Sequence, residues 1–376
     1  PKPQTPNPKP QTPKPYDYLV IYLPKTTMDG KKNYPARATV SKKLTVDQTD
    51  PAHPKFFCGP EKIKAGELLI EEKPLLSSPV AEYLTKLCHK CAKESTNLQR
   101  CSGCKYAHYC SQDDQIEDWK TAHKKECAIF QKIQQKFDKP IVHTLSMLVK
   151  VYVQLEYMKN EELKDFLDSV KHNPTQDKKK SQELYSKLAQ TVLEAAGEGD
   201  AEDAEQKVQK YVDYMSKILH SGVLIQGKKL MDDWVACGVY PTIRAINHSC
   251  APNSFPATNA KLIHRLAACR DIEPGEEITY SYVDLDQDYK WRQSQLKENF
   301  DLVCKCSKCE KEKADPAFLT SAKFEEEKMY ERPKNMEDLE YYLNRCKDML
   351  APNDYGWFRA FDLCTETLMR LCNHEY

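Results

Sequence analysis

The cysteines are the residues of this sequence with the most evident chemistry. The chain contains 16 of them, and many lie only two or three positions apart. Two thiolates from one turn can both reach a tetrahedral zinc ion at about 2.3 Å, so this spacing predicts metal sites rather than disulfides. The closely spaced cysteines are the CxxC pairs Cys88/Cys91 and Cys101/Cys104 and the CxCxxC cluster Cys304, Cys306 and Cys309.

More side chains that can bind zinc follow the second CxxC pair. They are Cys110, Asp114, His123 and Cys127. Thiolates, imidazole nitrogens and carboxylate oxygens all serve as zinc ligands, and a structural zinc ion takes four of them. Together with the two CxxC pairs, these residues predict two zinc ions.

Two further blocks have side chains that can orient a ligand. The run NHSCAPN occupies residues 247–253 and contains a proline that fixes the backbone. The block GEEITYSY, at residues 275–282, is a glycine turn that leads into a strand with tyrosines at alternate positions. In this order, and followed by the CxCxxC cluster, the blocks resemble the two signature segments of a SET-domain lysine methyltransferase and its zinc-binding post-SET segment.

The resemblance implies an S-adenosylmethionine cofactor and a set of residues that hold it. By resemblance, Asn247 and His248 hold the amino-acid and adenine ends of the cofactor. Gln226 offers a side-chain amide to the cofactor, and Phe300 stacks on the adenine. Tyr282 is the expected catalytic residue, because its hydroxyl orients the amine and the methyl group where cofactor and substrate lysine meet.

Two more tyrosines are expected to line the substrate channel. Side chains alternate along a strand, so Tyr280 shares a face with Tyr282; the second lining residue is Tyr240. The reaction itself is an in-line methyl transfer to a neutral amine, for which alignment alone can contribute roughly 7 to 11 kcal/mol. A nearby sulfonium and an apolar channel both lower the pKa of the substrate lysine.

Cys250 is expected to serve a third zinc ion. The cluster Cys304, Cys306 and Cys309 leaves a tetrahedral ion one ligand short. Cys250 lies in the NHSCAPN block and can complete the site. This link would hold the post-SET segment over the cofactor, and it makes a nucleophilic role for Cys250 improbable.

The first zinc-binding region resembles a MYND finger. The resemblance rests on the order of its ligands and on the pairs Tyr109-Cys110 and Asp118-Trp119. In that family the ligands interleave, which implies one ion on Cys88, Cys91, Cys110 and Asp114 and another on Cys101, Cys104, His123 and Cys127. A MYND finger also resembles modules that bind short proline-containing peptides.

Several positions depart from the families. Cysteine is usual at position 114, and one extra residue lies between Trp119 and His123. Asp114 can ligate through oxygen, or it can be a helix-capping acid while water or Asp113 fills the site. Residues 54–56 replace a Gly-x-Gly-type turn near the cofactor, unless the loop is rebuilt from residues 58–60. Arg244 replaces a small residue.

The elements that must position these residues follow from apolar patterns. The segment 68–70 reads as a strand after a turn at Gly66. Three stripes at steps of three and four predict buried helix faces: Ile141, Leu145, Leu148, Tyr152 and Leu155; Leu184, Leu188 and Val192; and Val208, Tyr211, Met215 and Ile218. C-terminal helices are predicted over 318–330, 336–350 and 357–372.

The order of the units resembles that of the SET- and MYND-domain (SMYD) methyltransferases. We predict an α+β fold in which a finger and helices interrupt a β-rich SET domain. The predicted units are a disordered proline-rich tail (1–16), the N-terminal part of the SET domain (17–85), the MYND finger (86–128), a helical insertion (129–221), the SET core (222–285), a post-SET zinc segment (286–312) and C-terminal helices (313–376).

The amino-acid composition limits the classes of partner that we expect for this protein. Lys plus Arg and Asp plus Glu both number 56, so no global field attracts nucleic acid, and the basic helix after the finger gives only a weak case for it. No run of about 18 apolar residues predicts a membrane span. Reduced cysteines in this number favour an intracellular protein. We expect a monomer in the nucleus and cytoplasm.

Two functions are compatible with these features. The first is a protein-lysine N-methyltransferase that uses S-adenosylmethionine and three zinc ions, and acts on a histone or another protein. The second is a catalytically weak or inactive scaffold that binds proline-containing peptides of partners in transcription regulation. The altered glycine turn, Gln226 and Arg244 favour the scaffold; Asn247, His248 and Tyr282 favour the enzyme.

Overall fold

The fold is known from a computed structural model, which describes residues 18–19, 37–47, 49, 54–136, 141–170, 179–226, 234–258, 261–285, 287, 289–314 and 335–349. The proline-rich tail and the helices predicted over 318–330 and 357–372 lie outside these residues. The helix predicted over 336–350 is α11 (Met336–Met349).

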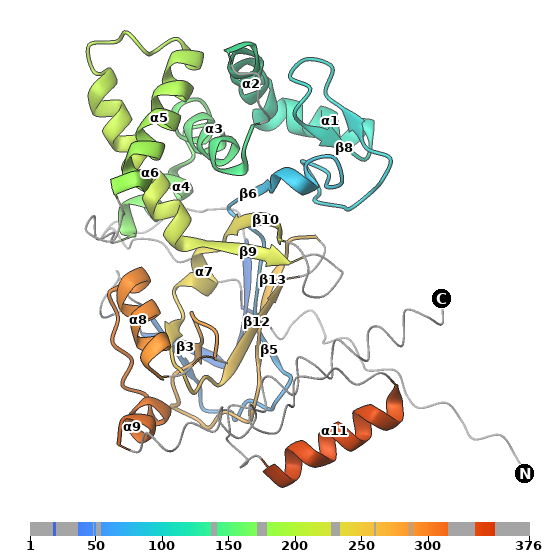
Figure 1. The fold of residues 1–376 in the computed structure, drawn as a ribbon, viewed down its shortest axis with the longest axis vertical. Coiled ribbons are helices and arrows are strands. Elements are labelled where there is room, and N and C mark those ends of the chain that lie inside the picture. The colour runs from blue at the N-terminus through green and yellow to red at the C-terminus, as the bar shows by residue number, and fades with distance from the viewer. Residues whose placement is uncertain are drawn as a thin grey trace, which may run out of the picture.

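The largest sheet joins segments that are far apart in the sequence. Its order is β1-β2-β5-β13-β12, and every neighbouring pair is antiparallel. Its strands are β1 (Tyr18–Leu19), β2 (Ala38–Ser41), β5 (Leu68–Glu72), β13 (His264–Ala268) and β12 (Ser254–Thr258). Ile70 of β5 is opposite Leu266 of β13, so the chain before the finger and the chain after the helices form one sheet (Figure 1).

Smaller sheets complete the β-structure. The order β6-β10-β9 is antiparallel, β3 pairs with β4, β7 pairs with β8, and β11 pairs with β14 in parallel. Their strands are β6 (Leu76–Pro79), β10 (Trp234–Val239), β9 (Gly222–Gln226), β3 (Leu44–Asp47), β4 (Lys55–Cys58), β7 (Gln99–Arg100), β8 (His108–Tyr109), β11 (Asn247–His248) and β14 (Thr279–Tyr280).

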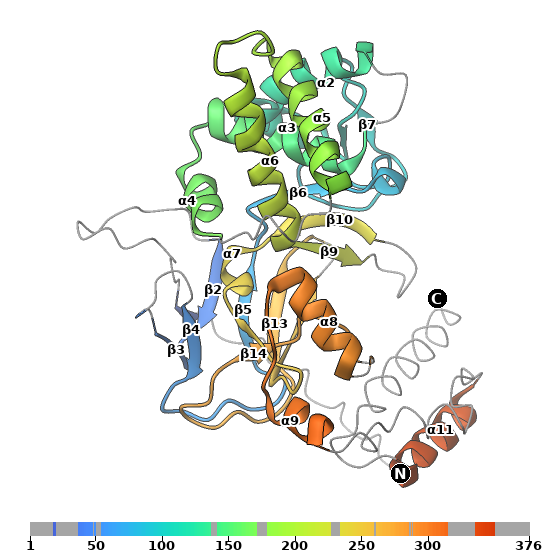
Figure 2. The same ribbon diagram turned by 60° about the vertical axis from the view of Figure 1, so that its left-hand side comes forward.

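The helices form two groups. Helices α2, α3, α5 and α6 gather with the finger at one end of the molecule, whereas α8 and α9 lie beside the sheets (Figures 1 and 2). The bounds are η1 (Ala81–Tyr83), α1 (Gln112–Asp118), η2 (Trp119–His123), α2 (Lys124–Lys136), α3 (His143–Glu156), α4 (Glu161–Ser169), α5 (Lys179–Ala196), α6 (Ala204–Ser221), α7 (Pro241–Arg244), α8 (Tyr289–Phe300) and α9 (Ser307–Ala314).

Strand β10 connects two buried clusters. Val239 packs with the finger and the helices, whereas Ala236 and Tyr240 pack with the large sheet. A third, smaller cluster forms around Cys250 and Leu296. The finger therefore rests on the helices, and the strand that enters the NHSCAPN block joins both halves of the molecule.

The predicted α+β class is confirmed, with mainly antiparallel sheets and segregated helices. Most of the helical stripes are buried as predicted, including Leu148 and Tyr152 of α3 and Met215 of α6. The prediction for Leu184 was wrong, because this side chain is 50% exposed; α5 buries Val192 of the same stripe, as predicted, and Ala189 beside it. No helix among the described ranges has the length and apolarity required to cross a bilayer.

The segment that replaces the glycine turn forms a strand. Phe56 lies in β4 with its ring buried in the core, and its carbonyl accepts from the N–H of Ile278 at 2.7 Å. Gly59 follows this strand, and a Cβ there would lie 2.8 Å from the carbonyl oxygen of Lys43. The close approach at Gly59 therefore serves the β3–β4 hairpin.

Candidate functional site

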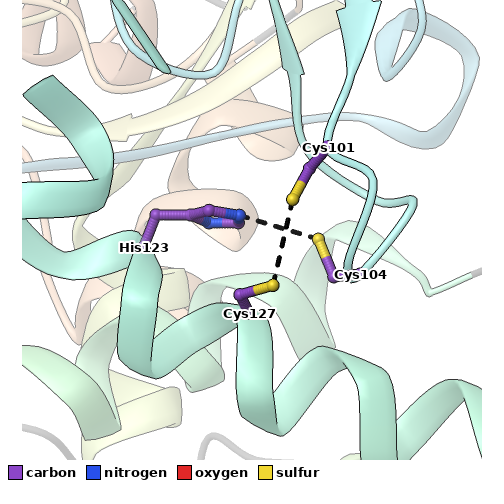
Figure 3. Close-up of side chains that lie close together, drawn as sticks. All are labelled: Cys101, Cys104, His123 and Cys127. Atoms are coloured by element: carbon purple, nitrogen blue, oxygen red, sulfur yellow. Dashed lines mark hydrogen bonds between the residues drawn. The ribbon is translucent and has the colours of Figure 1, made fainter. Parts of the chain in front are cut away.

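One group of zinc-type ligands lies entirely in the interior. Cys101, Cys104, His123 and Cys127 are all buried, and their ligand atoms lie within 4.8 Å of one another. Figure 3 shows the four side chains pointing toward a common centre, with Cys101 Sγ 3.9 Å from Cys127 Sγ and Cys104 Sγ 3.7 Å from His123 Nε2. A tetrahedron with arms of about 2.3 Å has edges of about 3.8 Å, so the group fits a zinc ion.

His123 is aimed at this centre by a local irregularity. Helix α1 continues into η2, a π-helical turn over Trp119–His123, before α2 begins. A π-turn accommodates one additional residue within a helix. This matches the extra residue noted between Trp119 and His123, and it leaves the imidazole facing the thiols.

Glu126 supports His123 and was missed in the sequence. Its carboxylate is buried and lies 3.6 Å from His123 Nδ1, while Nε2 of the same ring faces Cys104. Carboxylates in this position orient metal-binding histidines. The spacing of His123 and Glu126, three residues apart on a helix, is the signal that could have indicated it.

Asp114 belongs to the second group of the finger. Its Oδ2 lies 2.8 Å from Cys110 Sγ and 3.5 Å from Cys88 Sγ, and Cys91 completes the group. The hydroxyl of Ser111 caps α1 by accepting from the N–H of Asp114. The cap is therefore Ser111, and the Asp114 carboxylate faces the thiols.

The third group brings the NHSCAPN block to the CxCxxC cluster. The ligand atoms of Cys250, Cys304, Cys306 and Cys309 lie within 4.8 Å of one another. The side-chain amide of Gln293 donates to the carbonyl of Cys304 at 3.0 Å and to Cys309 Sγ at 3.4 Å. The cysteines from both segments thus form a four-sulfur set of the kind that holds structural zinc.

A buried ion pair fixes the helices around this group. Arg292 of α8 and Glu312 of α9 are both buried and form a direct salt bridge. Neither residue was singled out in the sequence, because long charged side chains in a polar helix ordinarily face water.

The two signature blocks lie side by side. Strands β11 and β14 pair in parallel, with Asn247 opposite Thr279 and His248 opposite Tyr280. Asn253, which is buried, accepts from the N–H of Thr279 at 2.9 Å and donates to the carbonyl of Glu277 at 2.7 Å. The second asparagine of the NHSCAPN run therefore fastens it to the strand.

Tyr282 stands at the centre of an aromatic cluster. Its ring centroid lies 5.2 Å from that of His248, 5.0 Å from Tyr280 and 5.0 Å from Phe300. Its hydroxyl donates to the carbonyl of Ile246 at 2.6 Å, and its N–H donates to His248 Nδ1 at 3.0 Å. Burial raises the pKa of Tyr282, so the side chain is a neutral phenol at physiological pH.

The other predicted site residues are placed as follows. Asn247 is half-buried and donates from its amide to Glu277 Oε1 at 2.6 Å. Tyr240 is buried, donates to the carbonyl of Leu262 at 2.7 Å and stacks on His264. Its described contacts are thus in the core rather than in the aromatic cluster. The side chain of Gln226 lies outside the described part of the structure.

Glu72 positions the segment that leads into the site. Its buried carboxylate accepts from the N–H groups of Thr242 and Ile243, both at 2.9 Å, at the start of α7. These amides have no partner within a helix. Desolvation raises the pKa of Glu72 to about 7, although the two amide hydrogen bonds oppose the shift.

The residues at the aromatic cluster meet part of what S-adenosylmethionine would require. The guanidinium of Arg244 lies over the rings of Tyr282 and Phe300, at 5.5 Å and 5.8 Å from their centroids. A cation of this chain therefore already covers the ring faces that could receive the sulfonium of the cofactor. The side-chain carbonyl of Asn247 and the carboxylate of Glu277 are acceptors of the kind that an ammonium group requires.

Comparison with known proteins agrees with this geometry. A model of the SET domain family matches residues 59–283, more than half of the chain. The chain is 28% identical over 301 residues to histone-lysine N-methyltransferase SMYD3 of Homo sapiens, covering 77% of this chain and 68% of the relative. It is 25% identical over 258 residues to N-lysine methyltransferase SMYD2 of Gallus gallus, covering 66% and 56%.

A fungal relative carries both domain names. The chain is 26% identical over 253 residues to SET domain and MYND-type zinc finger protein 6 of Schizosaccharomyces pombe, covering 66% of this chain and 48% of the relative. The chain thus spans about half to two thirds of the length of these relatives. From its SET-domain match, its finger and these relatives, we conclude that the chain belongs to the SET- and MYND-domain (SMYD) family.

Proposed function

We propose that this chain is an S-adenosylmethionine-dependent protein-lysine N-methyltransferase that acts on lysines of histones or other proteins. The observation that carries the proposal is the contact between the two signature blocks, in which the N–H of Tyr282 donates to Nδ1 of His248. It places the phenol beside the block that would hold the cofactor. The names of the matched relatives support the same reaction class.

The residues of this chain would contribute mainly by position. When bound, S-adenosylmethionine would supply an electrophilic methyl group. Asn247, with Glu277 at 2.6 Å, would hold the ammonium and carboxylate end of the cofactor. The ring of Phe300 would cover its adenine.

Tyr282 would act on the acceptor amine. Its hydroxyl hydrogen is engaged by the Ile246 carbonyl, which leaves oxygen lone pairs to accept from the N–H of an amine and so direct the nitrogen lone pair toward the methyl group. The raised pKa of Tyr282 keeps the hydroxyl protonated. Tyr280, 5.0 Å away, would form the apolar wall that favours the neutral amine over the ammonium ion.

Zinc would serve structure rather than chemistry. The ligand groups around Cys101, Cys110 and Cys250 would hold three zinc ions, two in the finger and one where the post-SET segment meets the NHSCAPN block. The finger would recognise proline-containing peptides of partner proteins. A protein that methylates histone and other lysines would work in the nucleus and cytoplasm.

Calorimetry combined with transfer of a labelled methyl group tests the proposal. We expect saturable binding of S-adenosylmethionine, transfer to core histones or a lysine-peptide library, and binding at least about tenfold weaker in Asn247→Ala. Asn97→Ala, an exposed change in the finger, is the matched control and should bind like the unmodified chain. No detectable heat at high protein concentration, together with no transfer, would reject the enzyme.

A second function has specific support. The cation at the aromatic cluster and the strand at residues 55–58 both depart from a site built for a sulfonium. They favour a scaffold that has kept the SET fold and binds partner peptides through the finger. If the chain binds proline-containing peptides, but does not bind the cofactor and forms no methylated product, it is this scaffold.

A further inference from the structure

Arg244 ends α7 and reaches into the aromatic cluster. Its guanidinium carbon lies 5.5 Å from the ring centroid of Tyr282 and 5.8 Å from that of Phe300. The two rings are themselves 5.0 Å apart and inclined by 50°. One cation therefore contacts the faces of both rings.

The positive charge of Arg244 is not neutralised by a neighbouring carboxylate. None of the ion pairs within the described residues includes Arg244, whereas Arg270 and Arg292 each pair with a glutamate. The Nε of Arg244 is buried and has no hydrogen-bond partner there. The ring faces and a side-chain hydrogen bond to Tyr282 thus hold this guanidinium.

A second cation in the same cluster would be disfavoured. Two unit charges about 6 Å apart repel strongly at the effective dielectric constant of a protein interior, and both would compete for the same ring faces. We propose that Arg244 is a charge-selecting gate, which makes the cluster discriminate against a sulfonium and in favour of a neutral thioether. This inference rests on the proposed function and names the regulation of that site.

The proposal predicts a ligand preference. S-adenosylhomocysteine lacks the methyl group and the positive charge of S-adenosylmethionine and is otherwise the same molecule. The chain should bind the neutral thioether more tightly, so the dissociation constant of S-adenosylmethionine divided by that of S-adenosylhomocysteine should exceed one. Neutralising position 244 should reduce this ratio by on the order of tenfold. A product held more tightly than the donor would keep the enzyme in a resting state until Arg244 leaves the cluster.

Calorimetric titration of both ligands into the zinc-loaded full chain is the test. Arg244→Met and Arg244→Gln remove the charge while keeping an extended side chain, Arg244→Lys keeps the charge, and Arg265→Met makes the same change on β13, outside the cluster. The ratio should fall in the Met and Gln variants. It should be unchanged in Arg265→Met and largely kept in Arg244→Lys. Thermal melts of each variant check that it is folded.

The outcomes separate this proposal from the proposed function. If the unmodified chain and the neutral variants bind both ligands with the same ratio of dissociation constants, the proposed role of Arg244 is wrong, whereas the proposed methyltransferase function is unaffected. If the neutral variants lose both ligands equally, Arg244 only supports the rings and the gate is again wrong. If no variant binds either ligand, both proposals fall.

Discussion

The backbone N–H of Tyr282 donates to Nδ1 of His248 at 3.0 Å, and this hydrogen bond determines the tautomer of the imidazole. Because Nδ1 accepts, the ring proton is on Nε2, which lies 3.3 Å from Sγ of Cys250. One imidazole thus connects the proposed catalytic phenol to a proposed zinc ligand.

Replacing His248 should disturb the phenol more than the fold. His248→Phe keeps a ring of similar shape but leaves the N–H of Tyr282 without its acceptor, a loss of roughly 1–3 kcal/mol in stability. We expect methyl transfer to fall by about 10²-fold, because small misplacements of aligned groups are costly. Kinetic assays with thermal melts measure both effects, and His143→Phe on α3 is the control. Equal activity in both variants would contradict the connection.

The hydroxyl of Tyr282 can be tested separately from its ring. Tyr282→Phe removes the hydroxyl that donates to the Ile246 carbonyl and that also forms a hydrogen bond with Arg244. This should lower stability by about 1 kcal/mol, whereas methyl transfer should fall by about 10²-fold or more. Tyr280→Phe, on the neighbouring ring, should have a smaller effect. Undiminished transfer in Tyr282→Phe would show that the hydroxyl has no part in orienting the amine.

Zinc content tests the role of Asp114. We expect three zinc ions per chain by elemental analysis and two in Asp114→Ala. The substitution leaves only the three thiolates of Cys88, Cys91 and Cys110 in this group, whereas a structural zinc ion takes four ligands. Asp114→Cys should retain three ions and resist a chelator longer, since a thiolate binds zinc more tightly than a carboxylate. Three ions in Asp114→Ala would mean that another ligand completes the site.

Ligand sets could be predicted from the sequence because their spacing is local. A CxxC pair occupies one turn, and the segment from Cys101 to Cys127 is short, with strand β8, helix α1 and the π-helical turn η2 before α2. The strand register that brings residues 247–253 to residues 279–282 followed only from the family resemblance. The contact of Arg244 with Tyr282 and Phe300 could not be predicted, because it depends on how α7, the end of β14 and the end of α8 meet.

Other parts of the fold left no usable pattern. Glu72 ends the run LLIEE and reads as an exposed acid of a strand, yet its carboxylate is buried against the start of α7. Leu184 satisfied the helical spacing, but it lies at the edge of the buried face of α5, which includes Val192 of the same stripe together with Ala189. In both cases tertiary packing overrides a local pattern.

The buried carboxylate of Glu72 should make stability depend on pH. Its pKa is raised from 4.5 to about 7 by desolvation, with a contribution from the nearby charge of Glu162. The folded state then holds more protons than the unfolded state between these values, so this group lowers the free energy of unfolding as pH rises from 4.5 to 7, by on the order of 3 kcal/mol.

Glu72→Gln should remove this slope. Urea unfolding at pH 5 and pH 8 should show a smaller loss of stability for the variant than for the unmodified chain. Glu71→Gln, the neighbour whose carboxylate pairs with Arg265 at the surface, should behave like the unmodified chain. Identical slopes in all three proteins would place the pKa of Glu72 in its ordinary range.

Removing one partner of the buried pair of Arg292 and Glu312 should destabilise the fold strongly, whereas replacing both partners with apolar residues should destabilise it much less. Arg292→Met alone removes the direct partner of the buried Glu312 carboxylate and leaves it with Lys308, whose Nζ lies 3.8 Å away, so we expect a loss of about 3 kcal/mol. The double change Arg292→Met with Glu312→Leu should recover most of it, because two apolar side chains avoid the desolvation of both charges. Chemical denaturation of the single and double variants gives the comparison, and additive losses would contradict it.

The pairing of β5 with β13 also constrains how the chain is made. Arg265 contacts Glu71 across these strands although 194 residues separate them. At roughly 5–20 residues per second on the ribosome, β5 waits on the order of 10–40 s for its partner, while the finger already has all its ligands. Nascent chains should therefore bind metal at the finger before β5 and β13 pair. Until then the edge of β5 is exposed, and chaperones would be needed there.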